Sequence, residues 1–290
     1  MPTLAPQLQR AAVLLETRAD DVALLSMREL SATVGLNPST FTRLARSLGF
    51  DDYAGLRQVV VDRIRARGHD SFSRQARKYV AGPKDKGKGR DTLPATLHDL
   101  HRSIVDNVDQ AYSDTSLQNV VTAAKVLAEG RRVYLIGARS CEALTMFFHY
   151  AARLFSEKVV LHTGLSDTRG DGFRFMKSGD VVLALTFEPY TKTTGEALQR
   201  ASALGAQIIL VTDSMLAPNA DLAALHLVAP VNTASFFHSL SAPLALLDAL
   251  LLAWLKKEGK KALVQLEHTD RLLQEDGVYL RQSLRAGMPI

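Results

Sequence analysis

The chain has 290 residues, which is enough for two domains that each bury a core of their own. With 47% hydrophobic residues, 22% charged residues and a formal net charge of +5, its composition is that of a folded globular protein and excludes a disordered chain. The single cysteine, Cys141, excludes an intrachain disulfide, and together with the lack of an export signal at the N-terminus it predicts a cytoplasmic protein.

The N-terminal region has the periodicity of helices only, and it contains a predicted helix, tight turn and helix. Ser26 and Glu29 form a capping box at the start of the first helix, and Gly35 ends that helix. Asn37 and Pro38 then begin the second helix as N-cap and first helical residue. One face of the second helix is apolar and is expected to be buried; it carries Phe41, Leu44, Ala45 and Leu48.

The other face of the second helix is expected to point outward, and it contains no carboxylate. Short hydroxyls on such a face can contact phosphates and base edges in a DNA major groove, while arginine reaches guanine or the backbone. A plain helical hairpin with a wet outer face is the alternative, but ordinary exposed helices mix both signs of charge. The side chains that we expect to bind DNA are Ser39, Thr40, Thr42, Arg43 and Arg46.

Basic residues crowd together after this motif. The stretch from Arg57 to Arg90 is rich in Lys and Arg and includes a predicted helix at 52–67. Such a stretch is typical of a partner that carries phosphates, although a solvated helix and a soluble linker are the alternative. Residues 81–92 are rich in Gly, Pro and Lys and cannot support a packed element, so we predict a linker between a helix-turn-helix domain at 1–80 and a second domain at 93–290.

The helix-turn-helix resembles that of the RpiR (MurR/RpiR) family of bacterial transcription regulators. The similarity runs from Leu25 to Leu30 and from Val34 to Phe50, and it includes Tyr53 and Leu56. The resemblance implies a C-terminal sugar isomerase (SIS) domain and an oligomeric regulator of carbohydrate genes. We therefore expect a homodimer or homotetramer that binds double-stranded DNA at a near-palindromic operator and acts as a repressor.

After residue 92, short β-branched runs alternate with helical stretches. This alternation predicts a parallel sheet with helices on both faces, so the expected fold class is an all-α helix-turn-helix domain followed by an α/β three-layer SIS-type domain. The stretch 236–255 is the most apolar, but Asp248 near its centre predicts a buried helix, and we expect no membrane partner. The predicted strands are 132–136, 159–162, 181–185, 208–211 and 225–228.

Ligands of open α/β sheets bind beyond the carboxyl ends of the strands, and two of the turns expected there are polar. In the first turn, Arg139 and Ser140 precede a helix start that is suited to an anion or a hydroxyl group. The second turn runs from Thr186 to Lys192 and precedes a predicted helix at 194–204. The helix after the first turn is expected to bury Leu144, Phe147, Phe148, Ala151 and Phe155.

The resemblance implies that the second turn corresponds to Ser-x-Ser-Gly-x-Thr, the segment with which SIS domains hold the phosphate of a phosphosugar. Thr186 and Thr191 match its outer hydroxyl positions. Glu188 and Pro189 do not match, because a carboxylate repels phosphate and proline has no amide to donate. We therefore hypothesise that the effector is a polyol, an unphosphorylated sugar or another small polar or cationic metabolite.

The expected contacts of this effector are Glu188 and Tyr190. The alternative is that Glu188 pairs with Arg139 and a sugar phosphate is held elsewhere in the crevice. Ser235 and His238 precede a long helix that ends near residue 257, and the resemblance implies that this end of the fold completes the pocket of a neighbouring subunit. A hydrogen-bonded core histidine is the alternative reading of His238.

Other chemistry receives weaker support from the sequence. His98 and His101 have a spacing compatible with a metal, but no third ligand is evident, so we expect no metal and no cofactor. Cys141 lies near a predicted helix start that favours a thiolate, and a small buried side chain is the alternative. The rival function is a sugar-phosphate isomerase with an N-terminal assembly domain, in which Glu188 or His238 is the base. An acid-free helix face has no obvious use in such an enzyme, so we predict a regulator without enzymatic activity.

Overall fold

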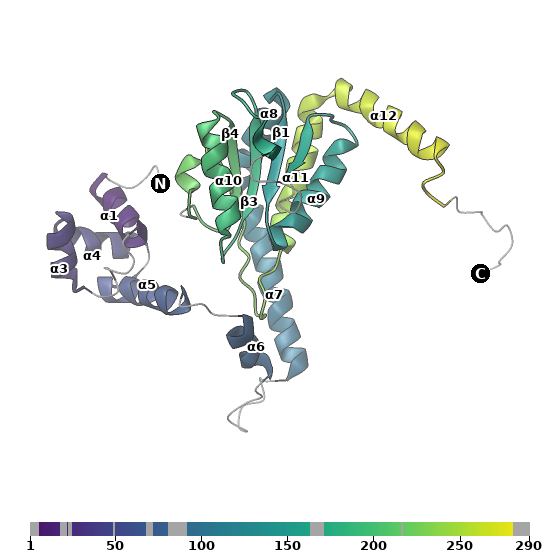
Figure 1. Cartoon of the computed structure of the whole chain (residues 1–290). Coiled ribbons are helices and arrows are strands. Elements are labelled where there is room, and N and C mark those ends of the chain that lie inside the picture. The colour runs from purple at the N-terminus through teal and green to yellow at the C-terminus, as the bar shows by residue number, and fades with distance from the viewer. Residues whose placement is uncertain are drawn as a thin grey trace. The chain divides into compact units, whose positions relative to one another are not determined.

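The structure is a computed structural model that describes residues 6–17, 22, 25–48, 50–67, 72–80, 92–162, 171–215 and 217–280, except for the side chains of 61–67 and Asp171. The chain divides into two compact units (Figure 1). The first unit is Met1–Lys86 with Ser235–Phe237, and the second is Gly87–Ala234 with His238–Ile290. Of the predicted linker 81–92, only Thr92 belongs to the described residues.

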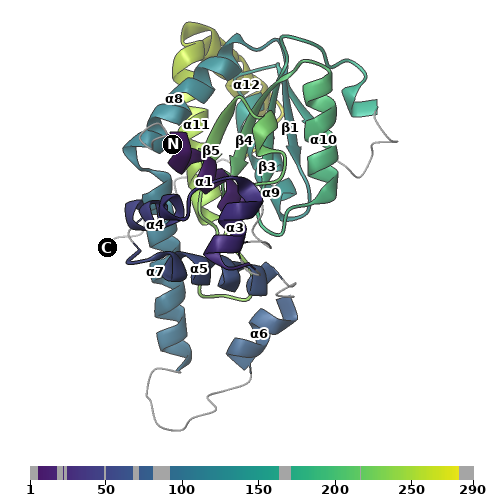
Figure 2. The ribbon, with the colours of Figure 1, turned by 90° about the vertical axis from the view of Figure 1, so that its left-hand side faces the viewer.

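The described part of the first unit is helical. Its elements are α1 (Pro6–Thr17), α3 (Met27–Val34), α4 (Pro38–Ser47), α5 (Tyr53–Arg67) and α6 (Phe72–Val80), as Figure 2 shows from one side.

Helices α3 and α4 form the predicted helix-turn-helix. The Ser26 N–H donates to the Glu29 carboxylate over 2.8 Å and the Glu29 N–H donates to the Ser26 hydroxyl over 3.3 Å, which confirms the capping box. Gly35 ends α3 with a φ of 65°, a conformation that favours glycine. The Asn37 side chain begins α4 by accepting the Ser39 N–H over 3.0 Å.

Two predictions about the faces of α4 are wrong. Thr40 was expected to point outward, but it is buried at 9% exposure, because it lies one turn before Leu44 on the edge of the buried stripe. Leu48 was expected to be buried, but it is 49% exposed, because it follows the last turn as C-cap with a φ of −98°. The core of the unit retains Phe41, Leu44 and Ala45, each fully buried.

The second unit is a three-layer α/β domain, as predicted. Its sheet has five strands in the order β2-β1-β3-β4-β5, and every pair is parallel. The strands are β1 (Val133–Gly137), β2 (Val159–His162), β3 (Val181–Thr186), β4 (Gln207–Thr212) and β5 (Leu225–Val228). The helices are α7 (Leu93–Ala111), α8 (Asp114–Glu129), α9 (Ser140–Arg153), α10 (Lys192–Ala203), α11 (Ser241–Glu258) and α12 (Lys260–Glu275), with short 3₁₀ turns η1 (Asp171–Phe173) and η2 (Ala220–Leu222).

Alternate residues of the strands enter two separate cores. Val133 and Leu135 of β1 pack with α8, α9 and α11, whereas Tyr134 and Ile136 pack with α10. Figure 1 shows α10 on one side of the sheet and α9 and α11 on the other. Phe147 of α9 does not join the core as expected, because it is 37% exposed. Helix α11 is buried along one side, as predicted, and no helix in the described part of the chain is long and apolar enough to cross a membrane.

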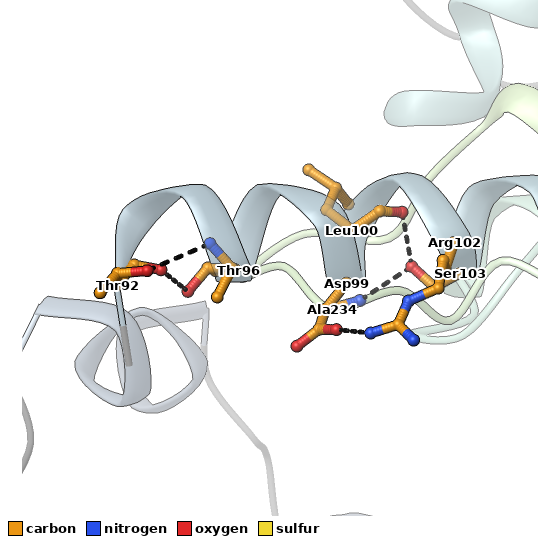
Figure 3. A network of polar contacts seen from close by, with 8 residues as sticks. Thr92, Thr96, Asp99, Leu100, Arg102, Ser103 and Ala234 are labelled. Carbon is orange, nitrogen blue, oxygen red and sulfur yellow. Dashed lines mark hydrogen bonds and ion pairs between the residues drawn. The ribbon is translucent and has the colours of Figure 1, made fainter. Parts of the chain in front are cut away.

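Helix α7 is tied to the segment that leads toward His238. The Thr92 hydroxyl caps the helix by accepting the Ala95 N–H over 3.4 Å. Further along, the Ser103 hydroxyl donates to the Leu100 carbonyl and accepts the Ala234 N–H over 3.3 Å, a network that Figure 3 shows together with the Asp99–Arg102 ion pair. One turn later the side-chain amide of Asn107 donates to the carbonyl of Asn232 over 2.8 Å. The segment 232–234 is therefore held against α7 by polar contacts.

Candidate functional site

The outward face of α4 presents two arginines to solvent. Arg43 and Arg46 are exposed, and α4 contains no acidic residue in its first turn or elsewhere. Ser39 is exposed as well, although its hydroxyl donates to the Asn37 side chain over 2.9 Å. Thr42 is half-buried and its hydroxyl lies 3.7 Å from the sulfur of Met27. The structure thus brings Ser39, Thr42, Arg43 and Arg46 to one accessible helix, and it withdraws Thr40 from it.

The packing behind α4 fixes its orientation on the first unit. The rings of Phe41 and Tyr53 meet edge to face with centroids 5.7 Å apart, and burial raises the pKa of the Tyr53 phenol. Arg57 donates through Nε to the carbonyl of Val22 over 3.0 Å, so this member of the basic stretch has a structural contact. On α6, Arg74, Arg77 and Lys78 are exposed. The other basic residues predicted to contact phosphates, from Arg63 to Arg67 and from Lys84 to Arg90, lie outside the described side chains.

The second candidate site lies at the carboxyl ends of the parallel strands. The Ser140 hydroxyl at the start of α9 is 3.0 Å from Nε2 of His238, a residue that comes much later in the sequence of the domain. The fold therefore brings together two predicted effector residues separated by 98 positions. Burial lowers the pKa of His238, and the nearby Asp213 carboxylate opposes that shift. Burial therefore favours the neutral imidazole of His238 as the hydrogen-bonding partner of Ser140.

Asp213 is a functional candidate that the sequence analysis missed. It follows β4 directly, and its carboxylate accepts the Tyr190 hydroxyl over 2.9 Å and the Glu188 N–H over 3.3 Å. Thr212 also donates to it over 3.3 Å. The signal that could have found Asp213 is its place directly after a buried strand, where ligand-binding residues of α/β sheets gather.

The structure does not contain the ion pair between Glu188 and Arg139 that the alternative interpretation requires. Among the described side chains, no ion pair joins Glu188 to Arg139, and Lys192 pairs instead with Glu196 over 3.5 Å. Glu188 is exposed, and its peptide bond to Pro189 is cis. The turns after β3 and β4 therefore carry two carboxylates: that of Glu188, which is exposed, and that of Asp213, which accepts the Tyr190 hydroxyl.

Arg139 has an unusual backbone conformation. Its φ of 60° and ψ of −125° lie in a region that side chains with a Cβ atom avoid. Gly137, two residues earlier, has no room for a side chain, because a Cβ atom there would lie 2.9 Å from Cγ2 of Thr145 and 3.1 Å from the carbonyl oxygen of Cys141. The end of β1 and the start of α9 are thus in close contact.

The remaining predicted effector residues have mixed positions. Thr186 is buried at 4% exposure at the end of β3. The Thr191 hydroxyl lies 2.7 Å from that of Thr194, which is itself buried. Ser235 belongs to the first compact unit, whereas His238 belongs to the second.

The structure also bears on the two weaker predictions, those of a reactive cysteine and of a histidine pair. Cys141 is buried, and burial raises the pKa of its thiol to about 11, so the thiolate reading is wrong and the buried one is confirmed. His98 and His101 are exposed on α7. Within the described ranges, no group of three or more His, Cys, Asp or Glu side chains could hold a metal ion.

Comparison with known proteins agrees with the fold. Residues 126–253 match the family model of the SIS domain, so this part of the chain is a SIS domain, and it follows a helix-turn-helix. An HTH-type transcriptional regulator of Caldanaerobacter subterraneus is 23% identical over 256 residues, which cover 86% of this chain and 85% of that protein.

Solved structures share the architecture. The sugar isomerase domain of the RpiR transcription factor from Sphaerobacter thermophilus is 20% identical with a TM-score of 0.55, and the match covers 62% of this chain and 98% of that one. The Vibrio vulnificus NanR protein, complexed with ManNAc-6P, is 16% identical with a TM-score of 0.54, over 95% of each chain. The family model and these structures agree with the fold that the resemblance to RpiR-type regulators implies, a helix-turn-helix followed by a SIS domain.

Proposed function

We propose that the chain is a cytoplasmic transcription regulator in which the helix-turn-helix binds operator DNA and the SIS domain senses a small polar metabolite without catalysing a reaction. The observation that carries this proposal is the exposed, acid-free face of α4 with Arg43 and Arg46, in a chain that also contains a SIS domain. The protein described as an HTH-type transcriptional regulator, similar over 86% of this chain, supports the same function. We assign DNA binding to residues 1–80, the linker to 81–92 and sensing to 93–290, and we propose a repressor.

DNA binding is tested by gel shift with the DNA upstream of the chain's own gene. Arg43→Ala and Arg46→Ala should each weaken specific binding by about tenfold, because each removes a contact to a base edge or a phosphate. Ser39→Ala and Thr42→Ala should have smaller effects, since both hydroxyls already have partners within the unit. Arg271→Ala on the exposed side of α12 is the matched control. Equal binding by Arg43→Ala, Arg46→Ala and the control would exclude α4 as the recognition helix.

The effector that best fits the crevice is a polyol, an unphosphorylated sugar or a small cationic metabolite. The carboxylates of Glu188 and Asp213 can accept hydroxyl or ammonium groups, and the Ser140–His238 pair can bind a further hydroxyl. We include Arg139, Thr186, Tyr190, Thr191 and Ser235 among its contacts. A phosphate placed about 4 Å from either carboxylate would meet a repulsion of about 4 kcal/mol at an intermediate dielectric.

Calorimetric titration with matched pairs of sugars and sugar phosphates tests this assignment. The unphosphorylated member should bind more tightly, and Glu188→Gln or Asp213→Asn should weaken it by about tenfold, because a charged hydrogen bond is lost. Glu157→Gln, at an exposed position outside the crevice, is the matched control. A sugar phosphate of the kind bound by NanR that binds tightly, and still does after Glu188→Gln, would contradict the assignment.

One observation favours a second function, that of a sugar-phosphate isomerase. Burial lowers the pKa of His238 and so favours its neutral ring, which lies beside Ser140 and could accept a proton from a bound substrate. A coupled assay with aldose and ketose phosphates decides between the two functions. Turnover that His238→Gln abolishes would establish the enzyme, whereas a lack of turnover together with specific DNA binding supports the regulator.

A further inference from the structure

A basic pocket lies at the end of the sheet opposite the effector crevice. Its residues come from the segment before β1 and from the segment between η1 and β3. Because β1 and β3 are parallel neighbours, with Val133 beside Val181, the two segments meet at the amino ends of these strands. The pocket has a volume of about 380 Å³, which is within the range of small-molecule sites. We call it the amino-end pocket, and it is lined by Arg131, Arg132, Arg174, Phe175, Met176 and Lys177.

Backbone hydrogen bonds hold the two segments of the amino-end pocket together. The Arg131 N–H donates to the Gly179 carbonyl over 2.9 Å, and the Val181 N–H donates to the Arg132 carbonyl over 2.8 Å. Gly179 has a φ of 87°, a conformation that favours glycine and that turns the chain into β3. Both lining segments are therefore fixed to the sheet.

A buried carboxylate orients one of the cations of the amino-end pocket. Asp180 is fully buried, and its Oδ2 accepts an N–H of the Arg131 guanidinium over 2.6 Å and the backbone N–H of Lys177 over 2.9 Å. The same guanidinium nitrogen donates to the Phe175 carbonyl over 3.1 Å. A guanidinium with two such partners is held in one orientation, so it loses less entropy when a ligand binds beside it.

The charge of the amino-end pocket favours an anion. Its six lining residues include four cations and no carboxylate, and Arg132, Arg174 and Lys177 are exposed. Positive charges around one cavity repel one another, whereas Asp180 behind them carries one negative charge. A ligand with several negative charges would relieve this repulsion. Phosphate is the anion that suits arginine, because the planar guanidinium can donate two parallel hydrogen bonds to it.

An exposed aromatic ring indicates which kind of phosphate ligand fits. Phe175 is 69% exposed although it lines the pocket, and Met176 beside it is buried. A large apolar ring at a cationic cavity offers a face on which a flat group can stack while its phosphates reach the cations. Nucleobases stack on aromatic rings in this way, and a simple sugar phosphate has no such group. The ring and the cations together favour a nucleoside phosphate.

We propose that the amino-end pocket is a second ligand site, which binds a nucleoside diphosphate. The phosphates lie against Arg132, Arg174 and Lys177, and the base stacks on Phe175. This inference goes beyond the proposed function and does not rest on it, because the pocket lies at the other end of the sheet from the effector crevice and away from the helix-turn-helix in the sequence.

Calorimetric titration of the full chain tests the class of ligand, with ADP, GDP, CDP and UDP as probes. At least one of them should bind with a dissociation constant below about 1 mM, and more weakly as salt rises. Pyrophosphate has the charges without the base, and the matching nucleoside has the base without the phosphates. Each should bind at least about fivefold more weakly than the diphosphate. Failure of all four diphosphates to bind, or a comparison compound that binds as tightly, overturns the proposal.

Substitutions test whether the nucleotide occupies this pocket. Arg132→Gln and Lys177→Gln should each weaken nucleotide binding about tenfold, whereas Arg132→Lys keeps the charge and should retain most of the affinity. Phe175→Leu should weaken the nucleotide about fivefold but leave pyrophosphate unchanged, because leucine keeps apolar bulk without a ring face. Arg271→Gln, at an exposed position on α12, is the matched control and should bind as the wild type does.

Two results of these titrations would overturn the pocket as a nucleotide site. Nucleotide affinity that Arg132→Gln and Lys177→Gln leave unchanged would place the nucleotide elsewhere. A loss of DNA affinity in the same two variants, without nucleotide binding by the wild type, would assign these cations to a DNA surface. Because the titrations contain no DNA, failure of this proposal is distinct from a failure of DNA binding.

Discussion

Arg139 has a backbone conformation that is unfavourable for any residue other than glycine. Replacing it with glycine should raise the free energy of unfolding by about 1 kcal/mol, because the relief of strain exceeds the extra entropy of glycine in the unfolded chain. Urea unfolding of the full chain measures the change. Arg139→Ala is the control, since alanine keeps the Cβ atom and should not raise the free energy of unfolding. Equal stability of the alanine and glycine variants would show that the backbone of Arg139 is not strained.

His238 should make the protein sensitive to mild acid. Burial lowers its pKa in the folded state, so the unfolded chain binds the proton first as the pH falls below the ordinary value near 6.5. Its contribution to stability is therefore complete above that value and decreases as the pH falls through it.

His238→Gln should accordingly lose less stability than the wild type between pH 7 and pH 5, measured by urea unfolding at both values. His268→Gln, at an exposed position on α12, serves as the comparison and should follow the wild type. Parallel pH profiles of the wild type and His238→Gln would show that the environment of His238 does not favour the neutral ring.

The joint between β1 and α9 depends on the absence of a side chain at Gly137. Gly137→Ala should lower the free energy of unfolding by about 1–3 kcal/mol, because the added Cβ atom would lie 2.9 Å from Thr145 and 3.1 Å from the backbone oxygen of Cys141. It should also weaken effector binding by displacing Ser140. At Gly55 in α5, an added Cβ atom would meet only ordinary contacts at 3.7 Å, so Gly55→Ala should stabilise the protein slightly. The two substitutions should therefore change the free energy of unfolding in opposite directions.

Helix α7 offers a route from the effector crevice toward the linker. Ser103→Ala and Asn107→Ala remove its bonds to the segment 232–234, which precedes His238. We expect both variants to bind effector and DNA nearly as the wild type does, but the effect of effector on DNA affinity should fall several-fold. Asn119→Ala, which loses a 3.4 Å bond to the His226 carbonyl, is the control and should keep the full effect. Undiminished coupling in Ser103→Ala and Asn107→Ala would exclude this route.

Most elements could be predicted from local patterns. The strands 159–162 and 225–228 have the predicted bounds, and the others differ by one residue at one or both ends, because buried β-branched runs between turns are unambiguous. Both helix caps of the helix-turn-helix also follow from single residues. Burial at the edges of a stripe was harder to predict, as Thr40 shows, because it depends on which neighbours cover that edge.

The candidate site was only partly predictable for a related reason. Polar turns after strands identify Ser140 and Glu188, but the contact between Ser140 and His238 joins positions far apart in sequence and appears only when the sheet is assembled. Asp213 was missed because a single aspartate after a strand has no distinctive pattern until Tyr190 is seen to donate to it. Phe147 was assigned to the core because periodicity alone does not distinguish a buried apolar face of a helix from an exposed one.

Across the whole molecule, the proposed regulator has a DNA-binding unit and a sensor domain joined by a linker. In the proposed function, the effector must bind two arrangements of the regulator with different affinity, since a ligand that binds both equally shifts nothing. The helix-turn-helix and the SIS domain are the proposed places of the two sites that such coupling requires. Regulation therefore depends first on specific DNA binding by the full chain.

Specific DNA binding is tested by fluorescence anisotropy with labelled DNA from upstream of the chain's own gene, compared with shuffled DNA of the same length across a salt series. We predict a preference of about a thousandfold or more for the upstream DNA, with an affinity that falls steeply as salt rises. Equal affinity for the two DNAs at every salt concentration would contradict it, and would assign the N-terminal unit to assembly rather than to recognition.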